Sequence, residues 1–96
     1  MDLPAPATYT LRLYITGPTP RSAEAVVNIR RLCEEHLAGR HELRIVDLSQ
    51  QPELAKRHQI VALPTLVKEL PLPQRRFIGD MSRIDRVLAG LDIRPA

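Results

Sequence analysis

The residues Thr16-Gly17-Pro18-Thr19 stand where a strand-like run ends and a helix-like run begins. A Cys-Gly-Pro-Cys tetrapeptide at such a junction exchanges thiols with disulfides, because the helix N-terminus lowers the pKa of the first thiol. Here threonines occupy both cysteine positions. A threonine hydroxyl without an adjacent base does not replace a thiolate, so the segment predicts the shape of a redox loop without its chemistry.

The other side chains that could do chemistry are one cysteine and three histidines. Cys33 cannot form an intrachain disulfide, which fits a reducing cytosol, and it falls on the apolar stripe of the expected first helix as a small core residue. His36, His41 and His58 follow no zinc-ligand spacing, and we expect them at the surface. The sequence has no phosphate-binding glycine loop and no nucleophile elbow. We therefore expect no enzyme activity, no metal and no cofactor.

A binding surface is what remains for function. The 14 Lys and Arg residues exceed the 11 Asp and Glu residues, which by itself suits an acidic protein partner or nucleic acid equally well. Aromatic residues make up only 3% of the chain and no nucleic-acid-binding motif is present, so we expect no nucleic-acid partner. No apolar run approaches the roughly 20 residues that span a bilayer, and we expect no membrane partner. Basic residues gather in the second half of the chain: Lys56, Arg57, Lys68, Arg75, Arg76, Arg83 and Arg86. The alternative to a binding surface there is an ordinary solvated charged face.

The first half of the chain predicts a strand, a helix and a second strand. Residues 9–15 alternate, with Leu11 and Leu13 on one face and Arg12 and Tyr14 on the other, which is typical of a half-buried strand. Ser22 is the expected N-cap of the helix, with an acidic residue, Glu24, in its first turn. The apolar stripe of this helix comprises Val26, Ile29, Cys33 and Leu37, and Gly39 is its expected stop. Residues 42–48 form the second strand.

The second half predicts a short helix, a hairpin and a last helix. Pro52 suits the first position of the short helix. Residues 65–70 and 75–78 form an antiparallel hairpin across the Pro-Leu-Pro turn. Ser82 and Asp85 give a weak capping box for the last helix, which ends near Gly90.

The resulting order, βαβαββα, predicts one α/β domain over residues 9–93, with residues 1–8 as a disordered N-terminal tail and 94–96 as a C-terminal tail. Strands joined by a helix pair in parallel, so the four-stranded sheet is mixed. This is the thioredoxin-like topology. Thioredoxin-like proteins place a cis-proline just before the third strand, where this chain has Pro64 in Val-Ala-Leu-Pro-Thr-Leu; an ordinary trans proline is the alternative.

Three segments together closely resemble the KaiB family of small clock proteins: YTLRLYITGPTPRSAEAVVNIRRLCEEHL, HELRIVDLSQQPELAKRHQIVALPTLVKELPLPQRRFIGDMS and VLAGLDI. The resemblance implies a non-enzymatic, cytoplasmic regulator that binds the N-terminal ATPase ring of KaiC, a hexameric RecA-like ATPase. In the cyanobacterial clock, bound KaiB recruits KaiA and competes with the histidine kinase SasA, which has a KaiB-like thioredoxin domain. The setting is a circadian clock or a clock-like signalling or stress system.

The resemblance also implies fold switching between a thioredoxin-like monomer and a ground state with the order βαββααβ, a homo-tetramer or dimer in which the second half is rebuilt. Gly90 and Asp92 match two positions that bias this balance, and Pro64, Pro71 and Pro73 lie in the rebuilt region. Local preferences favour the thioredoxin-like order, since two prolines oppose a helix in the hairpin region and Gly90 weakens a strand.

The basic hairpin region of the family matches Lys68, Arg75 and Arg76, and we expect these residues, with Lys56 and Arg57, to contact the partner as exposed charges. Two other functions stay open. A thioredoxin-like sensor module could act on a histidine kinase, and a redox enzyme is disfavoured by the missing cysteines.

Overall fold

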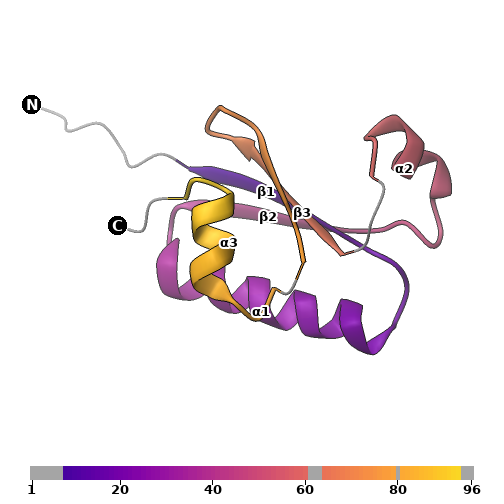
Figure 1. Ribbon diagram of the computed structural model, residues 1–96, viewed down its shortest axis with the longest axis horizontal. Helices are drawn as coiled ribbons and strands as arrows, with labels where there is room; N and C mark the ends of the chain where they lie inside the picture. Colours follow the sequence, from indigo (N-terminus) through magenta and orange to yellow (C-terminus); the bar gives the residue numbers. More distant parts are fainter. Residues whose placement is uncertain (1–7, 61–63, 80, 94–96) are drawn as a thin grey trace, which may run out of the picture.

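The computed structural model describes residues 8–60, 64–79 and 81–93, and Figure 1 shows their arrangement. Its elements are β1 (Tyr9–Ile15), α1 (Pro20–His36), β2 (His41–Asp47), α2 (Pro52–Arg57), β3 (Thr65–Leu70), β4 (Arg75–Ile78) and α3 (Ile84–Gly90). This order is the predicted βαβαββα, and the thioredoxin-like expectation is confirmed over the ground-state order. The predicted tails lie outside the described residues, apart from Thr8.

The four strands form one mixed sheet in the order β2-β1-β3-β4. β1 and β2 are parallel, with Leu13 beside Ile45, because α1 carries the chain back across the sheet between them. β3 runs antiparallel to β1, and β4 returns antiparallel to β3, with Lys68 opposite Arg75. β2 and β4 are therefore the two edges of the sheet.

The main core lies between one face of the sheet and the helices α1 and α3, whose buried residues belong to one cluster with those of the sheet. Leu11, Leu13 and Leu66 supply the sheet side, and all three are fully buried. The helices and the segments that flank them contribute Ala25, Ile29, Leu32, Cys33, Leu37, Met81, Val87, Leu91 and Ile93. The apolar stripe predicted for the first helix thus faces the sheet, with Leu32 added and Val26 only half-buried.

A second, smaller core covers the opposite face under α2. Tyr14, Leu48 and Val67 are buried there, packed against Val46, Leu54, Ala55 and Ile60. The prediction that β1 is apolar on one face only is therefore wrong at Tyr14, which is 2% exposed. An aromatic ring with one hydroxyl is amphipathic enough for either side, so alternation alone did not show that α2 would cover it.

The helix starts differ from those predicted. Thr19, and not Ser22, is the N-cap of α1, since its Oγ1 accepts a 3.1 Å hydrogen bond from the Ser22 amide. The helix begins at Pro20, so Glu24 lies beyond the first turn, which has no acidic residue. α3 begins at Ile84 with Arg83 at its N-cap position, so the predicted Ser82–Asp85 capping box does not start it. The helix ends agree better: α1 stops at His36, and Gly39 takes a positive φ of 72° three residues on.

Candidate functional site

The Thr16–Thr19 loop is held by polar contacts within the chain. Ser22, buried in the first turn of α1, accepts a hydrogen bond from the Thr16 amide at 3.3 Å, and its hydroxyl lies 3.4 Å from the Thr16 carbonyl oxygen to which it donates. The Gly17 amide donates to Asp47 Oδ1 at 2.9 Å, at a positive φ of 61° that glycine adopts without strain. The loop is thus a structural junction between β1 and β2.

Asp47 is a residue that the sequence reasoning missed. Its Oδ1 also accepts hydrogen bonds from the Ser49 hydroxyl at 2.6 Å and the Ser49 amide at 2.9 Å. The Ser49 hydroxyl, followed by the Gly17 and Ser49 amides, lowers the pKa of Asp47 below its ordinary value of 3.8. The Asp-x-Ser spacing at the end of a strand was the available signal, since Asp side chains there bond the backbone two residues on.

Cys33 is a buried core residue, as predicted, with 1% of its surface exposed. Burial, followed by the nearby charge of Glu34, raises the pKa of its thiol from 9.0 to about 11. A thiol with that pKa stays protonated at neutral pH and is a poor nucleophile. The one cysteine therefore has the opposite electrostatic environment from that of a redox catalyst.

The histidines are half-buried rather than at the surface. The His41 Nδ1 lies 2.9 Å from the Leu37 carbonyl oxygen, and the His58 ring packs at a tilt on Tyr14, with the ring centroids 6.0 Å apart. Among the described residues, no group of three His, Cys, Asp or Glu side chains could hold a metal ion. Each histidine has its own local environment, because β2 and α2 carry His41 and His58 to different parts of the fold.

The structure separates the five basic residues predicted to bind a partner. Lys56 and Arg57 are exposed on α2, and Arg75 is exposed at the start of β4. Lys68, in contrast, is 1% exposed, so the expectation of an exposed charge is wrong there. It shares the core-facing side of β3 with Leu66, two residues earlier. Its long aliphatic stem suits such a site, but its place in a strand with both faces packed was not evident from the sequence.

Arg76 has a structural partner. Its guanidinium donates to the Gln59 carbonyl oxygen at 2.7 Å and to the His58 carbonyl oxygen. Both carbonyls follow the last turn of α2, where cations are favoured. Arg76 therefore ties the end of α2 to the edge strand β4, which leaves Arg75 as the cation of this pair that is open to a partner.

The residues assigned to fold switching occupy special backbone or packing positions. Gly90 ends α3 against β4, where an added Cβ would lie 2.8 Å from Cδ2 of Phe77. Asp92 has a positive φ of 54°. Pro71 and Pro73, in the β3–β4 turn, both follow cis peptide bonds. The bond before Pro64 involves Leu63, so the predicted cis-proline lies outside the described residues.

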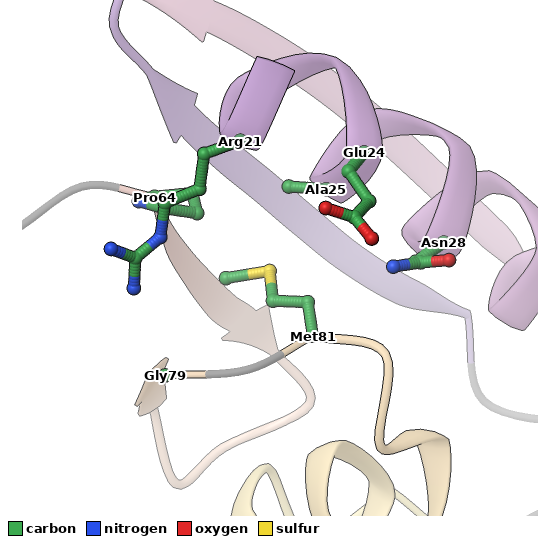
Figure 2. A pocket seen from close by; sticks show the side chains of 7 residues that line it. All are labelled: Arg21, Glu24, Ala25, Asn28, Pro64, Gly79 and Met81. Atoms are coloured by element: carbon green, nitrogen blue, oxygen red, sulfur yellow. The ribbon is translucent and has the colours of Figure 1, made fainter. Parts of the chain in front are cut away.

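A cleft of about 300 Å³ opens beside Pro64, and Figure 2 shows the side chains around it. Arg21, Glu24 and Asn28 line it from α1, and Met81 points into it from the opposite side. The full lining is Arg21, Glu24, Ala25, Asn28, Pro64, Gly79 and Met81. Its charged groups are one cation and one carboxylate from the same helix. Its described lining includes no cysteine, serine, threonine, lysine or histidine side chain.

These features define a thioredoxin-like protein whose redox positions are threonines. Solved structures agree on the fold. The N-terminal domain of Synechococcus elongatus SasA is similar with a TM-score of 0.72 and 20% identity, covering 93% of this chain and 84% of that one. Chloroplastic thioredoxin z is similar with a TM-score of 0.64 and 22% identity, covering 86% and 80%.

The sequence comparisons identify the family. The family model described as the KaiB domain matches residues 12–93. Circadian clock protein KaiB3 of a Synechocystis species is 49% identical over 85 residues, covering 88% of this chain and 83% of that protein. Circadian clock oscillator protein KaiB of Synechococcus elongatus is 44% identical over 86 residues, covering 90% and 84%. The chain belongs to the KaiB family, and the resemblance seen in its sequence is confirmed.

Proposed function

We propose that this chain is a non-enzymatic regulator that binds the N-terminal ATPase ring of a KaiC-type hexamer, in a circadian clock or a clock-like signalling or stress system. Membership of the KaiB family over residues 12–93 carries the proposal. We also propose that the complex is cytoplasmic, as the family resemblance implies. No helix of the described part of the chain is long and apolar enough to cross a membrane.

The chemistry of the fold supports binding over catalysis. Threonines stand at the redox positions, and the lone thiol, Cys33, is buried with its pKa raised to about 11. The hydroxyl of Thr19 is used as a helix cap. The Thr19 hydroxyl and the Cys33 thiol therefore both have structural roles here.

Exposed cations support an acidic partner surface. Arg75 on β4 and Lys56 and Arg57 on α2 lie at the surface, and Arg75 forms no ion pair with any described residue. An exposed ion pair across the interface contributes about 0.2–1 kcal/mol, and more where binding removes water from it. Several such pairs steer association as well as stabilise the complex.

A second proposal concerns competition. The fold of this chain is similar to that of the SasA N-terminal domain, with a TM-score of 0.72. Two modules of one shape can occupy one site on the ATPase ring, so we propose that this chain displaces a histidine kinase that carries such a domain. A direct action on the kinase is the alternative, and a KaiA-like protein is a further proposed partner.

The test is binding of the purified chain to the KaiC-like ATPase hexamer of the same organism, with ATP, measured by biolayer interferometry. Wild type binds, and Arg75→Glu weakens binding with an unchanged circular dichroism spectrum. Arg31→Glu, a matched reversal of an exposed arginine on α1, keeps wild-type affinity. Absence of binding by the wild-type chain would refute the proposed function, and equal weakening by both reversals would refute the role of Arg75.

A further inference from the structure

The turn between β3 and β4 presents large apolar side chains to solvent. Leu72 is 75% exposed and Leu70 is 51% exposed. The described residues include only two other exposed large apolar side chains, Val27 and Ile78, which lie on α1 and at the far end of β4. Figure 1 shows the turn apart from α1 and α2, so neither helix covers it.

This turn has an unusual composition for its place. Single exposed leucines are ordinary on a protein surface. Turns, however, are dominated by Gly, Asn, Asp, Ser and Pro, of which this one uses only proline, at Pro71 and Pro73. Two leucines and two prolines in succession make an apolar tip, residues 70–73, whose solvent-exposed surface contributes no hydrophobic burial to folding. Burial against a partner would remove this apolar surface from solvent.

The tip is also held in place. Behind it, Arg12 Nε lies 2.7 Å from Glu69 Oε1, which fixes the end of β3 against β1. The pyrrolidine rings of Pro71 and Pro73 restrict φ, so docking orders fewer backbone states. Contacts made by a preorganised element lose less entropy on binding.

The charge next to the tip is positive. The carboxylate of Glu69 is paired with Arg12, and Arg76 donates to backbone carbonyls near α2. Arg75, two residues after Pro73, is exposed and has no ion pair among the described residues. An apolar tip beside an open cation complements an apolar pocket that has a carboxylate on its rim.

We propose that the β3–β4 tip is the anchor of the interface, with Leu70 and Leu72 inserted in an apolar, acid-rimmed pocket of the partner. The inference rests on the proposed function, in which that partner is the ATPase hexamer. In such interfaces a few central, well-packed and desolvated side chains carry most of the affinity, while rim charges mainly set the association rate and its salt dependence. Leu72 is the central contact and Arg75 is the rim contact.

The experiment compares serine substitutions at exposed apolar positions in the same hexamer-binding assay. Leu72→Ser weakens binding by at least about tenfold, mainly through faster dissociation. Arg75→Glu mainly slows association and reduces its dependence on salt. Val27→Ser is the matched control, because Val27 is 56% exposed on α1, and it changes affinity less than about twofold. Circular dichroism confirms that each variant is folded.

The outcomes separate the two proposals. If wild type and Leu72→Ser bind the hexamer equally well, the anchor is refuted and the proposed function stands. If wild type does not bind, both fail. If wild type sediments as a dimer that Leu72→Ser dissociates, with hexamer affinity unchanged, a second copy covers the tip and the inference is wrong. If wild type co-sediments with phosphatidylserine vesicles and Leu72→Ser does not, again with hexamer affinity unchanged, the tip binds a membrane surface and the inference is also wrong.

Discussion

Replacing Gly90 by alanine is expected to destabilise this protein, although glycine is ordinarily the poorer helix residue. Gly90 is the last residue of α3, and its Cα faces the ring of Phe77 on β4. A Cβ added there would lie 2.8 Å from Cδ2 and 3.4 Å from Cε2 of that ring. Non-bonded carbons pack at about 3.5–4.0 Å, so either the ring or the helix must move.

The two opposing contributions can be compared. Alanine stabilises a helix over glycine by about 0.5–1 kcal/mol, and less at the final residue. Overpacking costs about 1–3 kcal/mol, and the half-buried Phe77 can turn partly aside, which favours the lower part of that range. The difference is a net loss of about 1 kcal/mol in the free energy of unfolding, which corresponds to a Tm lower by about 4–8 °C.

The assay is urea denaturation followed by far-UV circular dichroism at neutral pH. With a slope of about 1 kcal/mol/M, Gly90→Ala lowers the midpoint by about 1 M. Phe77→Leu removes the ring atoms that cause the clash, so Gly90→Ala in the Phe77→Leu background raises the midpoint instead. A double-mutant cycle therefore gives a coupling energy of known sign.

The refuting result is a stabilisation by Gly90→Ala that is the same in both backgrounds, since the contact with Phe77 would then have no energetic consequence. Sedimentation accompanies the measurement, because the family resemblance implies a second, oligomeric fold. A loss of about 1 kcal/mol in the thioredoxin-like state shifts such an equilibrium about fivefold toward the alternative. When only the thioredoxin-like state binds, partner affinity falls in proportion to the fraction of protein in that state, and so by at most the same factor.

Three further predictions concern single side chains. Arg76→Lys keeps the charge but loses the two-pronged contact with the Gln59 and His58 carbonyls, so it costs about 1 kcal/mol of stability, whereas Arg75→Lys is neutral in the same urea assay. Cys33 reacts slowly with Ellman's reagent in the folded protein and fast in urea. Because the pKa of its thiol rises from 9.0 to about 11 on folding, its contribution to stability declines as the pH rises through that interval. Asp47 has a lowered pKa in the folded protein, so its contribution to the free energy of unfolding is present above about pH 3.8 and is lost as the pH falls below it. The urea midpoint of Asp47→Asn therefore declines less than that of wild type between pH 5 and 3.

The sequence predicted the order of the elements because each has a strong local signal. Alternation in residues 9–15, the helical stripe of residues 20–36 and the proline at position 52 each indicate one structure. The helix starts were less certain, because Thr19 and Ser22 are both good N-cap residues. In the structure the Ser22 hydroxyl bonds the Thr16 backbone, and the Thr19 hydroxyl accepts from the Ser22 amide as the cap. Element type depends on many residues, whereas a boundary depends on one hydrogen bond.

The candidate site was predictable in composition and not in arrangement. Lys68 and Arg76 read as exposed cations, but strand pairing turns Lys68 to the core face of the sheet, and the path of α2 brings two carbonyls to Arg76. Both outcomes depend on contacts between segments that are distant in sequence. A sequence pattern reports charge and local preference, but not which charges tertiary contacts will remove from the surface.

Burial is divided unequally among the three helices, and this bears on how the fold could rearrange. α1 buries five residues, Ser22, Ala25, Ile29, Leu32 and Cys33, whereas α3 buries Val87 alone and none of the six residues of α2, all described, is fully buried. Segments with few buried contacts open at the lowest free energy. Arg76 hydrogen-bonds the end of α2, and Phe77 lies against Gly90 of α3, so these contacts add to the buried clusters that hold the two short helices. The proposed partner surface includes α2 and the strand β4. An interface there therefore acts beside the helices that bury the fewest residues, and a partner that binds only this arrangement also stabilises it.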